Sequence, residues 1–363
     1  MVSVHEILIL VMAAFAVLGA IDRIFGNKTG LGKEFEGGIL AMGALAMAML
    51  GIIALAPVLA NLLRPVVVPV YRLLGADPAM FAGTILACDM GGAPLAAELT
   101  DDPQAALLGG LLGGSMLGAT IVFTIPVAMG ILREEDRPFL AKGILSGIVT
   151  IPVGIFVGGL VAEIPVLKVL RNLTPVILIA ALITLGLWKA EKAMIKGFGW
   201  FGKGITALIT AGLALAIFQE LTGYTILPDL APLSDGFQTV GAIAIVLAGA
   251  FPLVYLLTKV LRKPLLKLGG VLGIGDTAAA GLVATLANSI ATFGLVKEMD
   301  DRGKVVNIAF AVSAAFVFGD HMGFTAGYAP EMLPAVIIGK LSAGITAVAV
   351  ALLLTRKKDI YTP

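Results

Sequence analysis

Three short groups of polar residues lie inside stretches that are otherwise apolar, and these are the places where the chain could bind a charged ligand. The first group is residues 87–94, in which Asp89 precedes two glycines and a proline. This order is typical of a break in a helix, where backbone amides and carbonyls become free to contact a ligand. We therefore predict that Asp89 pairs with a cation and that Cys88, Gly91 and Gly92 help to form its site. The alternative is that Asp89 caps the helix after the break.

The second group, residues 285–289, contains Asn288 and Ser289. Their side chains can both donate and accept hydrogen bonds, which suits a hydroxyl or an amine on a ligand. We include both in the predicted binding site. The alternative is that they only satisfy backbone groups that a helix break sets free.

The third group, residues 318–324, contains Asp320 and His321 within what we predict to be one long apolar helix. A carboxylate and an imidazole in hydrocarbon must pair with each other, with neighbouring groups or with water. Asp320 could supply a second carboxylate for a cation, and His321 could carry a proton near neutral pH. The alternative is a structural pair that holds this helix to its neighbour.

The composition indicates that lipid surrounds these groups. Hydrophobic residues make up 59% of the 363 positions and charged residues 13%, and the mean hydropathy is +1.02. Soluble domains carry about 25% charged residues, so this chain has too few to cover a surface that faces water. The 25 Lys and Arg almost balance the 24 Asp and Glu, which gives no reason to expect nucleic acid as a partner. Lys340, near the start of an apolar segment, is expected to reach the membrane surface along its aliphatic stem.

Catalytic and metal chemistry find little support in the residue counts. The chain has one cysteine and two histidines, too few for a disulfide within the chain or for a cluster of Cys and His ligands. No nucleophile with a neighbouring base is evident. We therefore predict no catalytic residues, no enzyme activity, no metal and no cofactor. The glycines between residues 109 and 118 are interpreted as close helix packing rather than as a phosphate-binding loop.

The binding groups must be positioned by helices that cross a bilayer, and a crossing needs about 20 apolar residues. Apolar segments of about that length recur along the whole chain, and residues 1–363 are predicted to form a single transmembrane transporter domain of the all-α polytopic class. The segments lie near residues 4–22, 37–63, 79–98, 106–132, 140–162, 173–190, 204–221, 238–258, 277–296, 305–328 and 333–355.

The chain also repeats itself at a spacing near 200 residues. Residues 95–101 align with residues 295–301, and shorter matches follow in the same order on both sides. The predicted repeats are residues 37–162 and 238–355. Internal duplication of this kind is typical of secondary transporters.

Charge distinguishes between two topologies for residues 79–98 and 277–296. If all segments cross, the Lys and Arg of alternate loops divide into about 13 and about 11, which gives no orientation. If these two segments are re-entrant hairpins, the division becomes about 20 and about 4, as the positive-inside rule requires. We therefore predict 9–11 membrane segments, two of them broken or re-entrant, with the two repeats inverted relative to each other.

Several runs of sequence resemble the ethanolamine-utilisation permease family, EutH, over nearly the whole chain. They include Phe35-Glu36-Gly37-Gly38, Met80-Phe81-Ala82-Gly83-Thr84, Ala87-Cys88-Asp89-Met90-Gly91-Gly92, Val283-Ala284-Thr285-Leu286-Ala287-Asn288 and Gly319-Asp320-His321. The resemblance implies a multi-pass permease of the bacterial cytoplasmic (inner) membrane that takes up ethanolamine for ethanolamine catabolism. The chain departs from the family pattern at Ala93-Pro94 and at residues 289–292, within the predicted site.

The expected partners follow from this resemblance and from the charges. Ethanolamine, or a similar small amine, is a monovalent cation with a hydroxyl, and two carboxylates exceed its single charge. A coupled proton or ion could supply the difference. Membrane lipid is a necessary partner, and glycine-rich helix faces allow a homo-oligomer. The competing hypotheses are a passive channel or facilitator for a small amine or another small cation, an intramembrane enzyme, and a scaffold.

Overall fold

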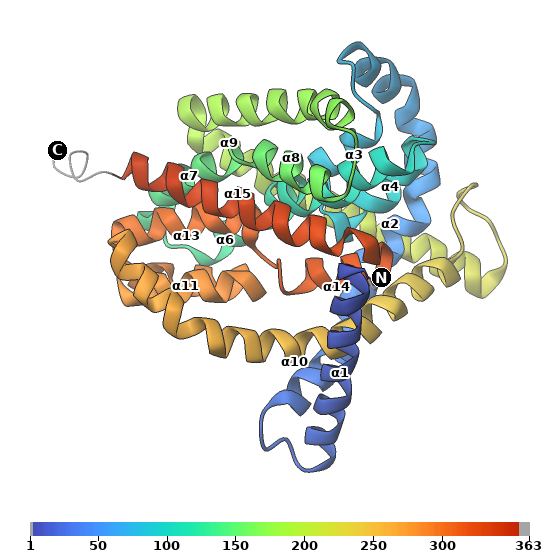
Figure 1. The fold of residues 1–363 in the computed structure, drawn as a ribbon. Coiled ribbons are helices and arrows are strands. Elements are labelled where there is room, and N and C mark those ends of the chain that lie inside the picture. Colours follow the sequence, from blue (N-terminus) through green and yellow to red (C-terminus); the bar gives the residue numbers. More distant parts are fainter. Residues whose placement is uncertain (1–2, 356–363) are drawn as a thin grey trace.

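The computed structural model describes residues 3–355, without the side chains of residues 261, 262, 265 and 268, and this part of the chain contains helices and no strand (Figure 1). The prediction of an all-α protein is confirmed. The α-helices are α1 (Val4–Ile24), α2 (Leu31–Leu73), α3 (Ala79–Ile85), α4 (Gly92–Leu99), α5 (Pro103–Ala106), α6 (Ile125–Ile131), α7 (Arg137–Ile148), α8 (Ile151–Val161), α9 (Val166–Thr222), α10 (Leu233–Leu272), α11 (Asp276–Ala287), α12 (Ser289–Leu295), α13 (Asp301–Ala314), α14 (Asp320–Tyr328) and α15 (Leu333–Leu354).

Seven helical stretches in the described residues are long and apolar enough to cross a membrane. One of them, α9, is two helices joined at a kink, because Ala190 has non-helical backbone angles (φ −144°, ψ 47°). If each arm of α9 crosses once, and α13 with α14 crosses once, the described residues contain nine crossings. Trp188 and Trp200 flank the kink and are exposed, as expected for anchors at a membrane surface.

The two predicted re-entrant segments are both hairpins. The first, α3–α4, is closed by a hydrogen bond from Thr100 Oγ1 to Asp77 Oδ2 (2.9 Å), and the second, α11–α12, by one from the Gly275 amide to Asp300 Oδ1 (2.8 Å). Each segment therefore enters and leaves at the same end of the molecule. The relative inversion of the two repeats stays a prediction.

The first hairpin packs against a helix of unusual width. Residues 103–131 form one helical stretch whose middle, Leu107–Gly118 and Thr120–Thr124, has the wider π-helical turn. A Cβ on Gly109 or Gly118 would collide with backbone carbonyls of α3 and of the residue that follows it. Glycine is therefore required for this approach, which agrees with the interpretation of these glycines as packing residues.

The long helix predicted for residues 305–328 is wrong, because the structure breaks it between α13 and α14. At the break Phe316 has a left-handed backbone (φ 62°), which is strained for a bulky side chain. The Phe316 amide donates to the Thr285 carbonyl (3.2 Å) and the Phe318 amide to the Leu286 carbonyl (2.9 Å). The segment therefore crosses the end of α11 and satisfies carbonyls that α11 leaves free.

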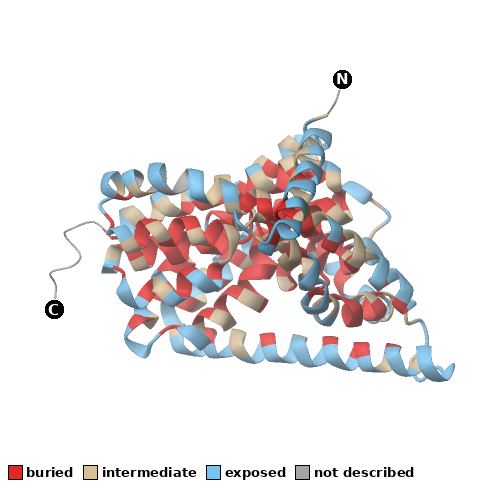
Figure 2. Ribbon diagram, turned by 90° about the horizontal axis from the view of Figure 1, so that it is seen from below, coloured by how far each residue is buried: buried red, intermediate tan, exposed pale blue. Residues whose placement is uncertain are grey.

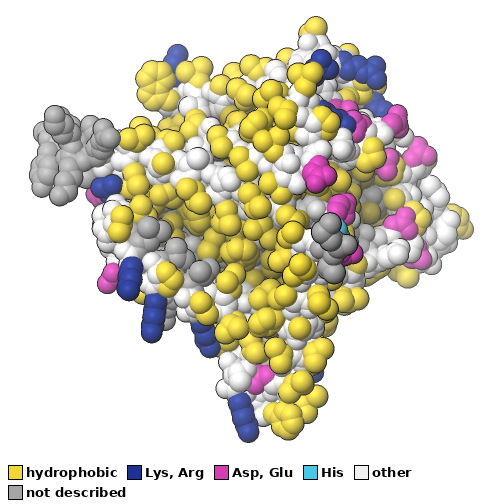
Figure 3. All heavy atoms as spheres, in the orientation of Figure 1, with side chains coloured by type: hydrophobic (Ala, Val, Ile, Leu, Met, Phe, Trp, Pro, Cys, Tyr) yellow, Lys and Arg dark blue, Asp and Glu magenta, His cyan; other side chains and the backbone are white. Residues whose placement is uncertain are grey.

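Buried residues gather in the interior of the helix bundle (Figure 2), and apolar side chains cover much of the face drawn in Figure 3. Basic side chains lie toward the edges of the face drawn in Figure 3. The prediction that Lys340 reaches the membrane surface is wrong. Lys340 is 1% exposed, and its Nζ donates to the Ser115 carbonyl (2.5 Å) of the π-helical stretch. Residues 356–358, which contribute to the charge count, lie outside the described residues.

Candidate functional site

The first and third polar groups meet at a cavity of about 270 Å³, which we call the central cavity. It lies between the middle of α2, the tip of the first hairpin, the π-helical stretch and the break between α13 and α14. Its walls are alanine, leucine, methionine and phenylalanine apart from two carboxylates and one imidazole. The lining residues are Ala41, Ala44, Leu45, Ala48, Ala87, Asp89, Met90, Ala119, Phe123, Phe316, Asp320 and His321.

Asp89 lies at the tip of the first hairpin, in a short 3-10 turn formed by Cys88–Met90. The following helix, α4, begins after Gly91, which has a left-handed backbone (φ 101°) and provides no side-chain cap. The carboxylate of Asp89 makes no capping hydrogen bond and lines the cavity instead. The alternative that Asp89 caps α4 is therefore wrong.

His321 faces Asp89 across the cavity wall. The distance from His321 Nε2 to Asp89 Oδ1 is 3.9 Å, and the Cys88 Sγ lies 4.0 Å from the same oxygen. The three ligand atoms lie within 4.8 Å of one another, a spacing that could hold a metal ion and that the residue counts did not reveal. His321 Nδ1 is buried without a hydrogen-bond partner among the described residues.

Asp320 lies between two cavities. It lines the cavity of Asp89 and also a second one, again of about 270 Å³, whose other polar residues are Glu34, Tyr255, Thr258 and Asn288. The carboxylate has no hydrogen bond or ion pair with the described residues. Asp89 and Asp320 thus line one cavity whose other walls are apolar apart from His321.

Comparison with known proteins shows which kind of protein carries this site. Residues 4–354 match the model of the family described as "Ethanolamine utilisation protein, EutH". This chain belongs to the EutH family. No solved structure matches it significantly.

Three curated relatives cover nearly all of the EutH chain. The "Probable ethanolamine permease EutH" of Listeria monocytogenes serotype 1/2a (strain 10403S) is 58% identical over 98% of this chain and 95% of its own. The protein of the same name from Escherichia coli (strain K12) is 48% identical over 98% and 97%. The "Uncharacterized protein YxeR" of Bacillus subtilis (strain 168) is 48% identical over 97% and 95%. The resemblance found in the motifs is confirmed, and this EutH chain is a multi-pass membrane protein of a permease family rather than an enzyme.

The second polar group of this EutH protein does not line the central cavity. Asn288 lines the second cavity, and its Oδ1 accepts a hydrogen bond from the Ile290 amide (2.7 Å) at the start of α12. Ser289 is fully buried, and its Oγ has no partner among the described residues. The structural alternative for Asn288, that it satisfies the broken backbone, is therefore seen directly.

Two glycines and the cysteine of the predicted site lie behind the cavity wall. Cys88 is fully buried, and Gly92 is packed against the carbonyls of residues 86 and 87. Gly91 packs against the side chain of Ile52 so closely that a Cβ would collide with it. These residues shape the turn that presents Asp89 rather than line the cavity.

Sequence reasoning missed the aromatic walls of the EutH site. Phe123 and Phe316 pack edge to face with ring centroids 5.4 Å apart, and the Phe316 ring lies 5.3 Å from that of His321. Phe123 and Met90 also line a third, open cavity of about 910 Å³ that extends to Trp200. No periodic signal distinguishes these two phenylalanines from the other fifteen in the chain.

Proposed function

We propose that this protein is a permease that takes up ethanolamine, or a similar small amine, across the bacterial cytoplasmic membrane. The observation that carries the proposal is that Asp89 and Asp320, from two separate helix breaks, line one cavity that is apolar apart from these carboxylates and His321. The relatives from Listeria monocytogenes and Escherichia coli are both named "Probable ethanolamine permease EutH", and ethanolamine is a cation at neutral pH. We further infer that the whole chain forms one transport domain built from the repeats 37–162 and 238–355, in inverted orientation.

The cavity offers a separate partner for each part of such a ligand. An ammonium group would be very unfavourable in hydrocarbon without a counter-charge, and Asp89 and Asp320 supply it. Phe123 and Phe316 can add attraction between the cation and the faces of their rings. The hydroxyl can bond to backbone groups that the helix breaks set free. Because one water molecule occupies about 30 Å³, about 270 Å³ is ample for a two-carbon amine.

The charges also favour coupling to a proton. Asp89 and Asp320 carry more negative charge than one amine neutralises, and His321 Nε2 lies 3.9 Å from Asp89 Oδ1. We infer that this pair holds a proton in part of the transport cycle. Uptake that does not change with pH on either side of the membrane would exclude this role.

The proposal also requires a route to the site that opens and closes. Met90 and Phe123 line both the central cavity and the open cavity that extends to Trp200. Lys196 and Lys203 also line the open cavity, so it belongs to the end of the molecule that is richer in Lys and Arg. By the positive-inside rule this end faces the cytoplasm, and we infer that Met90 and Phe123 separate the site from the cytoplasm.

The test is uptake of labelled ethanolamine into liposomes that contain the purified full-length protein. Wild type should show saturable uptake that unlabelled ethanolamine blocks, and Asp89→Asn should lower it by about 30-fold or more, because losing one partner of a buried charge pair costs about 2–5 kcal/mol. Asp229→Asn is the matched control, since Asp229 is exposed and its left-handed backbone (φ 63°) suits Asn equally.

Two results would count against the proposal. If folded wild-type protein takes up no more ethanolamine than empty liposomes under any pH or ion gradient, ethanolamine is the wrong substrate. If uptake equilibrates but never accumulates against a gradient, the protein is a passive facilitator rather than a secondary transporter. Accumulation driven by a pH gradient would support both the carrier and its coupling.

A further inference from the structure

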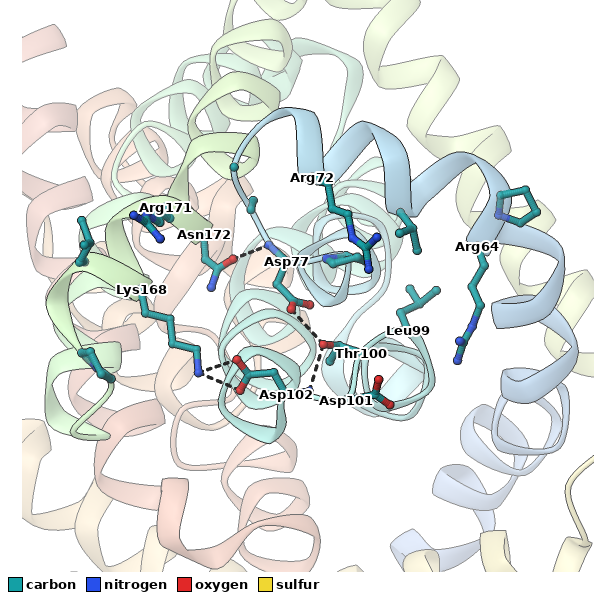
Figure 4. Close-up of a pocket in the computed structure, with 17 residues that line it drawn as sticks. Arg64, Arg72, Asp77, Leu99, Thr100, Asp101, Asp102, Lys168, Arg171 and Asn172 are labelled. Carbon is teal, nitrogen blue, oxygen red and sulfur yellow. Dashed lines mark hydrogen bonds and ion pairs between the residues drawn. The ribbon is translucent and has the colours of Figure 1, made fainter.

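The loops at one end of the helix bundle line a much larger cavity of about 1100 Å³, which opens to the surface and is separate from the site of Asp89 (Figure 4). It is bounded by the end of α2, the two ends of the first hairpin and the start of α9. Its basic side chains are Arg64, Arg72, Lys168 and Arg171. These four are also all the Lys and Arg that the charge count places at this end of the protein.

Two of the three carboxylates that line this cavity accept hydrogen bonds from the protein. Asp77 accepts hydrogen bonds from the Ala79 amide (2.9 Å) and from Thr100 Oγ1 (2.9 Å). Asp102 pairs with Lys168 (2.6 Å), as Figure 4 shows. Burial raises the pKa of Asp102, but the hydrogen bonds that it accepts from Lys168 and from backbone amides of α5 outweigh this and lower its pKa below the usual value. Asp77 keeps its negative charge because both of its hydrogen-bond donors are neutral, whereas the charge of Asp102 is balanced by Lys168.

The remaining donors have no acceptor within the described part of the chain. Arg72 and Arg171 make no hydrogen bond or ion pair there. Asn172 is 3% exposed, and its Oδ1 accepts from the Asp77 amide (2.7 Å), which leaves its amide nitrogen without a protein acceptor. Arg64 donates to the Glu98 carbonyl (2.5 Å). Asp101 is the only acidic lining residue that has no hydrogen bond or ion pair with the described residues. The lining carries four basic side chains against three carboxylates, so its net charge is one positive charge, which suits an anion.

The surroundings indicate where the anion comes from. Leu167 lines the cavity and is 60% exposed, and Leu73, next to Arg72, is 89% exposed. Val166 and Leu170 continue this exposed apolar surface along the first turns of α9. Exposed arginines that line a cavity, with an apolar surface beside them, match a phospholipid, whose phosphate and acyl chains are adjacent.

We propose that this cavity binds the phosphate of an anionic phospholipid headgroup. Arg72 and Arg171 bind the phosphate oxygens, for which the planar guanidinium is suited. The amide nitrogen of Asn172 adds a hydrogen bond, and the acyl chains lie along Leu73 and Leu167. Because Asp77 and Thr100 close the first hairpin at the same place, the bound lipid links α2 and α9 to the base of this hairpin.

Native mass spectrometry of the purified full-length protein tests this proposal. The protein is equilibrated with phosphatidylglycerol or with phosphatidylcholine of the same acyl chains, and retained lipid is counted. Wild type should retain phosphatidylglycerol about tenfold or more better than phosphatidylcholine. Arg72→Gln with Arg171→Gln should abolish the preference, and Arg171→Gln alone should reduce it. The control, Lys189→Gln with Lys192→Gln, removes the same charge at exposed positions elsewhere and should leave the preference unchanged.

Three outcomes would overturn the proposal. Equal retention of both lipids by wild type would show that the cavity does not select an anionic headgroup. An unchanged preference in the double arginine variant would place the lipid elsewhere. Displacement of the lipid by millimolar inorganic phosphate, in a protein that keeps its size-exclusion profile, would identify a soluble phosphate as the ligand instead.

Discussion

The two re-entrant hairpins share a design but differ at their tips. Both are closed at their base by a hydrogen bond to an aspartate, and both turn back within the molecule. The first turns through a 3-10 turn that carries Asp89, followed by left-handed Gly91. The second turns at Asn288, whose backbone is extended (φ −158°, ψ 123°) and whose side chain caps α12.

This difference shows how one kind of scaffold can serve two purposes. At the first tip the backbone turns without help from a side chain, so the carboxylate of Asp89 is free to face the cavity. At the second tip the polar side chain of Asn288 is used by its own backbone. The second hairpin acts through its neighbour, because the Thr285 and Leu286 carbonyls hold the broken segment that leads to Asp320. We therefore infer that the first hairpin binds the substrate and that the second hairpin positions Asp320.

The largest expected effect within this comparison is that of Asp320→Asn. If the second hairpin serves to position Asp320, removing its charge should lower ethanolamine uptake by about 10- to 100-fold. Asp89→Asn should lower uptake more, because it also removes the partner of His321. The measurement is the initial uptake rate in liposomes over a range of substrate concentrations. Uptake like that of wild type would break the comparison, since the site would then need only the first hairpin.

A sharper test of the first tip is Gly91→Ala. The left-handed backbone and the contact with Ile52 both oppose a Cβ, so we expect a loss of about 2–3 kcal/mol of stability and a lower melting temperature in detergent. Gly294→Ala on the second hairpin is the matched control, because nothing lies within 4 Å of the added Cβ. Equal melting temperatures for the two variants would contradict the requirement for glycine at the first tip.

Much of this architecture could be predicted from the sequence, because hydropathy and charge act over whole segments. The re-entrant hairpins followed from the balance of Lys and Arg between alternate loops, which a single residue hardly changes. The break before Asp320 could not be predicted, because residues 315–319 are as apolar as a helix interior and the break depends on carbonyls of α11 that are distant in sequence. For the same reason Phe316 was missed.

For a related physical reason, only the charged residues of the site could be predicted from the sequence. A charged side chain in hydrocarbon is costly wherever it lies, so Asp89, Asp320 and His321 could be selected by residue type alone. Whether a neutral residue such as Asn288 faces a ligand or its own backbone depends on local geometry that the sequence does not contain. Lys340 was misplaced because its partner, the Ser115 carbonyl, lies 225 residues away.

At the second tip, Asn288→Ala should reduce stability more than it reduces transport. Loss of an N-cap costs about 1 kcal/mol, so we expect a small fall in melting temperature and an uptake rate within about threefold of wild type, at an unchanged half-saturating concentration. Asn288→Asp should restore the cap and the melting temperature, because Asp caps as well as Asn. A folded Asn288→Ala protein without uptake would show instead that the second tip contacts the substrate.

The smallest expected effect concerns the base of the first hairpin, where Asp102 caps α5 and pairs with Lys168 (2.6 Å). Asp102→Asn keeps the cap and removes only the charge. The pair is partly exposed, so we expect a fall in melting temperature of about 1–2 °C at pH 7.

The pKa of Asp102 is lowered in the folded protein. The stabilising effect of Asp102 is therefore complete above the unfolded pKa of about 3.9 and is lost as the pH falls through the lower, folded value. The difference between variant and wild type should therefore shrink below about pH 4, and a difference that grows on acidification would show that the ion pair does not stabilise this end of the hairpin.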